Sequence, residues 1–189
     1  GVAGSVRIGG AVVEWLREAV IGLNLCPFAG KPFRAGEVRV EVSDAGGFEE
    51  AVFDALQAAF ELLETAPEQT RTTLIVFPDA LADFDEYLDA ADVMRATLSD
   101  AGADGILQVA TFHPDYRFAD TDPDSVENYT NRAPCPVLHV LREDDVSDAI
   151  ESHPDPEAIP ERNIAKMREI GEDGLAELWK QFNGTDEGG

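Results

Sequence analysis

Cysteine, lysine and long apolar runs are all scarce in this chain of 189 residues. The two cysteines, Cys26 and Cys135, are too few for a disulfide scaffold and fit a reducing compartment. No run approaches the roughly 18 apolar residues of a membrane span, and the first ten residues lack the pattern of a signal peptide. We therefore predict a cytoplasmic protein with no membrane partner.

Basic residues are few, and acidic residues are abundant. The 14 Lys and Arg residues against 38 Asp and Glu residues give a formal net charge of −24. A field of this sign repels DNA, RNA and anionic membrane surfaces, so we expect no nucleic-acid partner. Only 3 of the basic residues are lysines, which fits either a surface adapted to high salt or an ordinary acidic protein.

Several common signatures are also missing. The chain has no GxGxxG, GxxxxGK[ST] or GxSxG pattern, so dinucleotide, nucleoside-triphosphate and serine-hydrolase sites lose their usual motifs. It has no HxH, HExxH or CxxC spacing that would indicate a metal centre. The two Cys-Pro pairs alone do not support a haem site.

The apolar residues that are present alternate between helical and strand patterns. Helical spacing predicts helices over 11–22 and 48–64, with Val52, Leu56, Phe60 and Leu63 as the apolar face of the second. Asp83 and Glu86 fit a capping box, which starts a third helix that ends at Gly102. Strands are predicted at 38–42, 73–77, 106–112 and 137–141. Three helical pieces follow, near 145–152, from Pro160 to Gly171, and around 175–182.

This order of elements predicts one α/β domain over 1–182. We expect a four-stranded, mostly parallel or mixed sheet, flanked by helices and closed by a C-terminal helical cap. A ferredoxin-like α+β sandwich is the alternative. Residues 183–189 are predicted to be a disordered tail.

The segment 113–136 interrupts the alternation, because it is rich in proline and acidic residues and shows no period. A loop of this length in a small domain is either functional or disordered. His113 lies just after a predicted strand, and Arg132 and Arg142 follow in the same region. An imidazole beside arginines is typical of a site where acid/base chemistry acts on an anion. The alternative is structural, with His113 bonded to a backbone carbonyl and the arginines paired with nearby carboxylates.

Other candidates are less specific. His139 lies mid-strand, where a satisfied core histidine is the commoner outcome. Together with His113 and Glu143 it could instead bind a divalent metal ion, which is an alternative interpretation. Cys26 lies in a Pro- and Gly-bounded turn, either as an inert thiol or lining the same cleft as His113.

Five ordered blocks of the chain carry a family resemblance: LNLCPFA (23–29), TLIVFPDALADFDEY (73–87), GILQVATFHPDYRFA (105–119), NYTNRAPCPVLHVLRE (128–143) and IPERNI (159–164). They resemble the bacterial family catalogued as domain of unknown function 1415, over about residues 10–170. The resemblance implies a single folded domain and assigns no reaction.

We therefore expect a small enzyme that acts on a small anionic metabolite. In this hypothesis His113 is the acid/base, Tyr116 and Asn131 orient the substrate, and Cys26 adds a catalytic thiol. Arg132 and Arg142 clamp the anion, so His113, Arg132 and Arg142 are predicted to converge on one pocket. The alternatives are a noncatalytic metal- or ligand-binding protein that uses 113–136, and an interaction module with Trp179 and Phe182 exposed.

Overall fold

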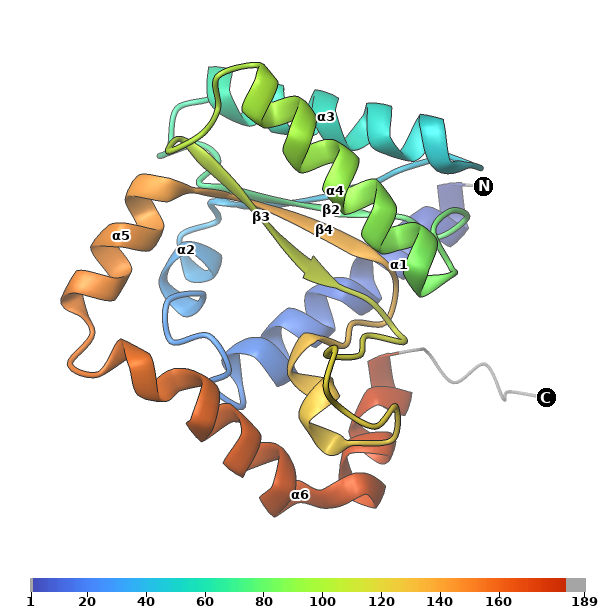
Figure 1. Cartoon of the computed structure of the whole chain (residues 1–189), viewed down its shortest axis with the longest axis vertical. Coiled ribbons are helices and arrows are strands. Elements are labelled where there is room, and N and C mark those ends of the chain that lie inside the picture. Colours follow the sequence, from blue (N-terminus) through green and yellow to red (C-terminus); the bar gives the residue numbers. More distant parts are fainter. Residues whose placement is uncertain (1, 183–189) are drawn as a thin grey trace.

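Four strands form one mixed sheet in the middle of the molecule (Figure 1). They are β1 (Val38–Val42), β2 (Thr72–Val76), β3 (Leu107–Phe112) and β4 (Val137–Arg142), and their order across the sheet is β1-β2-β4-β3. β1 and β2 pair in parallel, whereas β4 is antiparallel to both of its neighbours. The prediction of a single α/β domain with a four-stranded mixed sheet is confirmed.

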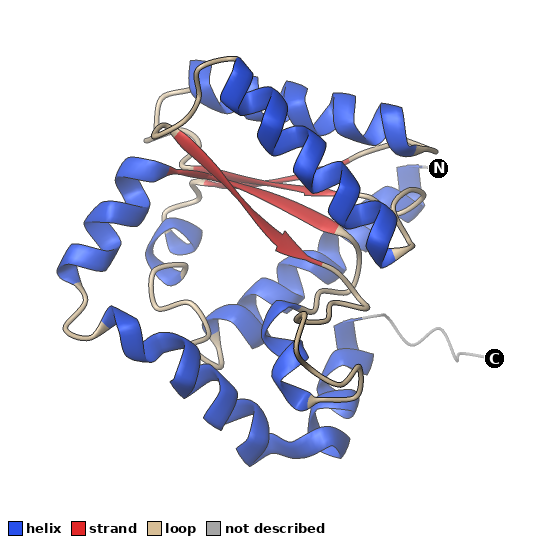
Figure 2. Ribbon diagram, in the orientation of Figure 1, coloured by secondary structure: helices blue, strands red, loops and turns tan. Residues whose placement is uncertain are grey.

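The computed structural model describes residues 2–182, so the predicted tail at 183–189 lies outside the described residues. The helices are α1 (Val2–Trp15), α2 (Gly30–Arg34), α3 (Phe48–Glu64), α4 (Phe84–Asp100), α5 (Glu143–Ser152) and α6 (Ile159–Phe182). Shorter elements are the π-helix η1 (Leu16–Ile21) and the 3-10 turns η2 (Val126–Asn131) and η3 (Pro156–Ala158). α3 and α4 cover one face of the sheet, and the remaining helices cover the other (Figures 1 and 2).

Both faces of the sheet are covered, which explains the mainly apolar sequences of its two central strands, β2 and β4. Successive side chains of a strand point to opposite faces, so β2 sends Ile75 into the core under α3 and α4, and Leu74 into the core under α1 and α6. β4 divides in the same way, with Leu138 in the first core and Val137 in the second. The sheet therefore separates two cores.

Helix ends follow the predicted signals. The Asp83 carboxylate accepts a hydrogen bond from the Glu86 amide at 2.9 Å, which caps the start of α4. Gly102 follows α4 with φ 84, a conformation that favours glycine. Gly171 interrupts α6 with φ 78 and ψ 168, so two helical segments meet at the glycine where the sequence predicts a helix end.

One predicted apolar face is partly wrong, and the exposed patch of the alternative interaction module is wrong. On α3, Val52 is buried and Leu56 packs on the core as predicted, whereas Phe60 and Leu63 are exposed. Most of the buried face consists of alanines, because small residues let the helix approach the sheet and α4 closely. Trp179 and Phe182 are buried rather than exposed, since α6 packs them against the core under the sheet. Across residues 2–182, no helix combines the length and apolar character that a membrane crossing would need.

Candidate functional site

His113 follows β3 and is fully buried, and both of its ring nitrogens are engaged. Nε2 lies 2.9 Å from the Leu81 carbonyl, and Nδ1 accepts a hydrogen bond from the Asp115 amide at 3.0 Å. A carbonyl only accepts, so Nε2 carries the hydrogen and the ring is neutral. Burial lowers the pKa of His113 and stabilises that neutral form. This geometry matches the structural alternative, because neither nitrogen is left for a substrate.

The other residues proposed around His113 hold the loop together. Asn131 Nδ2 donates to the Thr111 carbonyl at 3.0 Å, and the Tyr116 ring packs against Phe84. Arg132 donates through Nε to the Tyr116 carbonyl at 3.2 Å and through Nη2 to the Pro123 carbonyl at 2.7 Å. The segment 113–136 is therefore an ordered, internally bonded unit.

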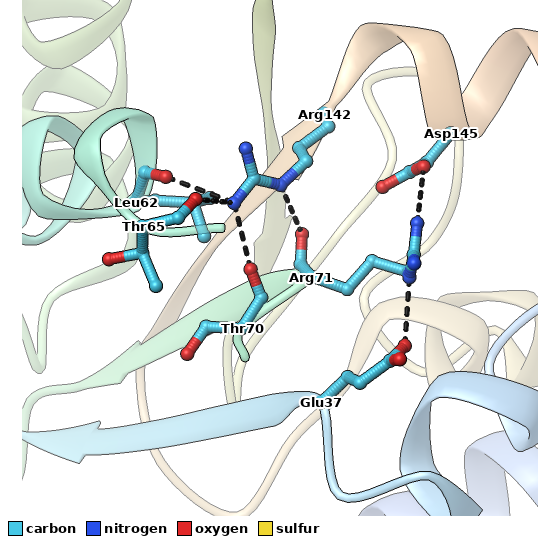
Figure 3. Close-up of polar contacts among 7 residues, drawn as sticks. All are labelled: Glu37, Leu62, Thr65, Thr70, Arg71, Arg142 and Asp145. Carbon is cyan, nitrogen blue, oxygen red and sulfur yellow. Dashed lines mark hydrogen bonds and ion pairs between the residues drawn. The ribbon is translucent and has the colours of Figure 1, made fainter. Parts of the chain in front are cut away.

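Arg142 lies at the end of β4 and binds four backbone carbonyls (Figure 3). Nη2 donates to the carbonyls of Leu62, Thr65 and Thr70 at 3.0, 2.8 and 2.8 Å, and Nε donates to the Arg71 carbonyl at 3.1 Å. These acceptors belong to the end of α3 and the loop after it. Arg142 thus ties that loop to the sheet.

The prediction that His113, Arg132 and Arg142 share one pocket is wrong. The antiparallel register pairs Phe112 with Val137 and Leu107 with Arg142, so His113 and Arg142 lie at opposite ends of the β3–β4 pair. Five residue steps along a strand are about 17 Å. The sequence did not reveal this separation because the direction of β4 was unknown.

The alternative metal set is separated as well. His113 packs beside Phe84 and Tyr87, on the side of α4. His139 lies on the opposite side of the sheet, opposite Leu74 in the register with β2. Glu143 does not extend the strand, because it begins α5. Within residues 2–182, no group of three or more His, Cys, Asp or Glu side chains is arranged to hold a metal ion.

A pocket of about 560 Å³ lies between the sheet and the helices on the side of α2 and α5. Its walls are largely apolar and come from β1, β2 and β4, from α5, and from the segment around α2; they include Leu16, Phe28, Phe33, Leu74, Leu141 and Val146. Three of the sequence candidates line it: Cys26, His139 and Arg142. Cavities of this size hold small organic molecules.

His139 is the polar group on the strand wall of the pocket, and Thr72 fixes its tautomer. The Thr72 hydroxyl lies 2.6 Å from the Val140 carbonyl and 2.7 Å from His139 Nε2. Its single hydrogen goes to the carbonyl, so Nε2 must donate to Thr72, and Nδ1 keeps its lone pair. Nδ1 has no hydrogen-bond partner among the described residues. Burial lowers the pKa of His139 to about 4, so the ring is a neutral acceptor at pH 7.

Ionic groups line another part of the pocket (Figure 3). Arg71 donates through Nε to Glu37 and through Nη1 to Asp145, both at 2.8 Å. Asp145 lies in α5, so this ion pair connects the helix to the sheet edge. The second carboxylate oxygen of Asp145, Oδ2, is buried and has no hydrogen-bond partner within residues 2–182. Arg71 and Asp145 were not predicted, because isolated charges in an acidic chain carry no motif.

Cys26 is half-buried in the wall of the pocket, in the turn before α2. Burial is the main influence on its thiol and raises the pKa, while hydrogen bonds from the Phe28 and Ala29 amides partly oppose this effect. The thiol is therefore protonated at neutral pH. Cys135 is buried in the core and donates to the Phe77 carbonyl at 3.2 Å.

Comparison with known families gives one match. The family model described as Protein of unknown function (DUF1415) matches residues 7–177, which is most of the chain. The chain belongs to this family. Neither the curated proteins nor the solved structures include a match. Membership in the DUF1415 family confirms the resemblance carried by the five sequence blocks, and assigns no reaction to the pocket.

Proposed function

We propose that this DUF1415 protein binds a small organic molecule in the pocket lined by His139. The observation that carries the proposal is a mostly apolar cavity of about 560 Å³ that contains a neutral imidazole with an unused acceptor atom. An apolar body with one hydrogen-bond donor, a hydroxyl or an amine, complements such a site.

The charges around the pocket favour a ligand that donates a hydrogen bond over an anionic ligand. Arg71 is bound by two carboxylates, which offset its charge, and Arg142 by four carbonyls, so each guanidinium group keeps a single nitrogen, Arg71 Nη2 or Arg142 Nη1, outside these contacts. Lys31, the third cation, is exposed. His139 Nδ1 and Asp145 Oδ2, two atoms at the pocket with no hydrogen-bond partner within residues 2–182, are both acceptors. We therefore replace the anionic ligand of the sequence hypothesis with a hydrogen-bond donor.

Binding without thiol catalysis is the simpler function. A nucleophilic cysteine needs a lowered pKa, and its partner base works best with a pKa near 7. Burial shifts both groups the other way, since it raises the pKa of Cys26 and lowers the pKa of His139 to about 4. A Cys26–His139 pair is consequently neutral and not activated.

Hexan-1-ol, hexylamine and hexanoate test the proposal, since they share one apolar chain and differ in the polar end. Because Cys26 lines the pocket, a bound ligand should slow its alkylation by iodoacetamide, measured by mass spectrometry. We expect the alcohol and the amine to protect Cys26 at lower concentration than hexanoate. Better protection by hexanoate would support the anion hypothesis instead, and no protection by any of the three would refute binding in this pocket.

Two substitutions of His139 separate its nitrogens. His139→Gln places an amide near Nε2 and removes the Nδ1 acceptor, whereas His139→Asn retains an oxygen near Nδ1. Loss of one hydrogen bond to a ligand corresponds to about tenfold in affinity. We expect His139→Gln to lose that factor for hexan-1-ol and His139→Asn to keep most of the binding, with both variants folded by circular dichroism. Equal affinity of His139→Gln and wild type would contradict the role of Nδ1.

A further inference from the structure

α3 has two apolar faces, and the larger side chains are on the outer one. The face toward the sheet buries Ala51, Ala55, Ala58 and Ala59, with Val52 and Leu62. The outer side carries Phe53, Phe60 and Leu63, and Leu56, which falls on the same helical stripe, is partly buried against the core. Phe53 is 66% exposed, Phe60 39% and Leu63 38%. A helix whose outer face contacted only water would bury its large apolar side chains and carry the smaller ones on the outer face.

α4 lies beside α3 on the same face of the sheet and adds one residue to this exposed set (Figure 1). Val93 of α4 is 43% exposed. We call Phe53, Phe60, Leu63 and Val93 the outer apolar surface. Exposed apolar groups gathered in this way mark interaction sites more often than scattered single residues do.

The charge around this surface is mainly negative, although Arg39 of β1 pairs with Glu61 of α3. α3 and α4 together contain ten acidic residues and a single basic residue, Arg95. Glu49 and Glu64 lie one turn before Phe53 and one turn after Phe60, at the two ends of the stripe. Neither forms a hydrogen bond or ion pair with another residue of the described chain. An open hollow of about 520 Å³ adjoins Phe53 and is lined by Asp44, Glu49, Glu50 and Asp54.

We propose that the outer apolar surface docks a basic amphipathic segment of another protein. The apolar side of such a segment would cover Phe53 and Phe60, and its Lys or Arg side chains would lie against the glutamates and in the hollow beside Phe53. A cation over an exposed aromatic ring adds to this attraction. A second copy of this chain is disfavoured as the occupant, because each copy carries a net charge of −24. The inference does not depend on the pocket, which lies on the other side of the sheet.

Fluorescently labelled peptides of about 18 residues, roughly the length of α3, test this surface with the full chain. One peptide carries Lys and Leu at amphipathic helical spacing, a second replaces Lys by Glu, and a third replaces Leu by Ser. We expect only the Lys/Leu peptide to bind, with affinity that falls at least tenfold between about 50 mM and about 500 mM NaCl. Equal binding of the Glu/Leu peptide would overturn the proposal.

The double variant Phe53→Ser/Phe60→Ser locates the binding. Because both rings are exposed, we expect its melting temperature to stay close to that of the wild type and its affinity for the Lys/Leu peptide to fall at least tenfold. Ile106→Ser is the matched control, because Ile106 is 50% exposed and lies outside this surface. Equal weakening by both changes, or by neither, would refute docking on α3.

Charge is tested in the same way. Glu49→Gln/Glu64→Gln should weaken the Lys/Leu peptide, whereas the exposed α6 pair Glu172→Gln/Glu177→Gln removes equal charge and should not. Equal effects of the two pairs would show attraction by net charge alone and overturn the assignment. Sedimentation tests whether the occupant is a second copy of this chain. If the wild type forms a dimer and Phe53→Ser/Phe60→Ser abolishes it, the occupant is a second copy and the proposal is overturned.

Discussion

Arg142→Met is the change that best separates a structural role for Arg142 from a role in ligand binding. Arg142 donates four hydrogen bonds to carbonyls at the end of α3 and in the loop after it. These carbonyls include the negative end of the α3 dipole, which a cation stabilises further. Met preserves the apolar stem and removes every donor. The change therefore tests the polar contacts with little loss of packing.

The expected cost follows from the geometry. A hydrogen bond from a charged donor contributes about 1.5–3 kcal/mol, but three of the four share one nitrogen, Nη2, and cannot each contribute fully. Two effective bonds give a loss of about 3 kcal/mol in the free energy of unfolding. For a domain of this size, that loss lowers the melting temperature by about 6–12 °C.

Circular dichroism during thermal and urea unfolding measures this loss. Arg117→Met is the control, because Arg117 is exposed and forms no hydrogen bond or ion pair with another described residue. We expect the control to change the free energy of unfolding by less than about 0.5 kcal/mol. If Arg142→Met is as stable as Arg117→Met, the carbonyl contacts do not stabilise the fold and the structural role is refuted.

Three further predictions concern stability. Burial lowers the pKa of His139 to about 4 and also lowers the pKa of His113, so below pH 6.5 the unfolded chain binds more protons than the folded chain. The stability contributed by these neutral imidazoles should be complete above that pH and fall toward pH 4. His139→Asn should flatten this fall in the free energy of unfolding, measured by urea titration. Asn128→Ala should cost about 2–4 kcal/mol by the same assay, because this fully buried amide bonds Phe118, Thr121 and Asp122, whereas an unchanged value would exclude it as the anchor of the loop. Added KCl should raise the melting temperature by screening a net charge of −24, and a flat response to molar salt would contradict this.

The strands were predictable because burial on both faces leaves unbroken apolar runs. The run at 73–77 became β2, and the run at 137–141 became β4. The position of β4 was not predictable, since apolar periodicity carries neither strand order nor direction. The fold class was therefore accessible from the sequence, while the geometry that separates His113 from Arg142 was not.

For the site as well, some side-chain positions could be predicted from the sequence and others could not. His139 was correctly placed in mid-strand, and alternation along the strand assigns it to the face of Val137 and Leu141. Its partner Thr72 lies 67 positions earlier in the sequence, and no local pattern connects the two. Asn128 lies in a polar stretch of the sequence, and its role in the loop depends on burial, which the sequence does not display.

The face of α3 was misassigned for a related reason. The apolar spacing of Val52, Leu56, Phe60 and Leu63 fits a buried face, but the alanines form a second stripe that packs more closely and leaves Phe60 and Leu63 exposed. A helix with two apolar stripes buries the one that fits its neighbours and leaves the other exposed. In this chain the stripe left exposed is the one with the phenylalanines, which is why the outer apolar surface exists.

The pocket and the outer apolar surface lie on opposite sides of the sheet. Arg142 connects the two sides directly, because it lines the pocket and donates to the Leu62 carbonyl of α3, but it contacts neither His139 nor the two phenylalanines. Changes at distant sites without shared partners have additive effects. His139→Gln should therefore leave the Lys/Leu peptide affinity unchanged, and Phe53→Ser/Phe60→Ser should leave the protection of Cys26 unchanged. A departure from additivity in the combined variant would show that the two sites are coupled through the sheet.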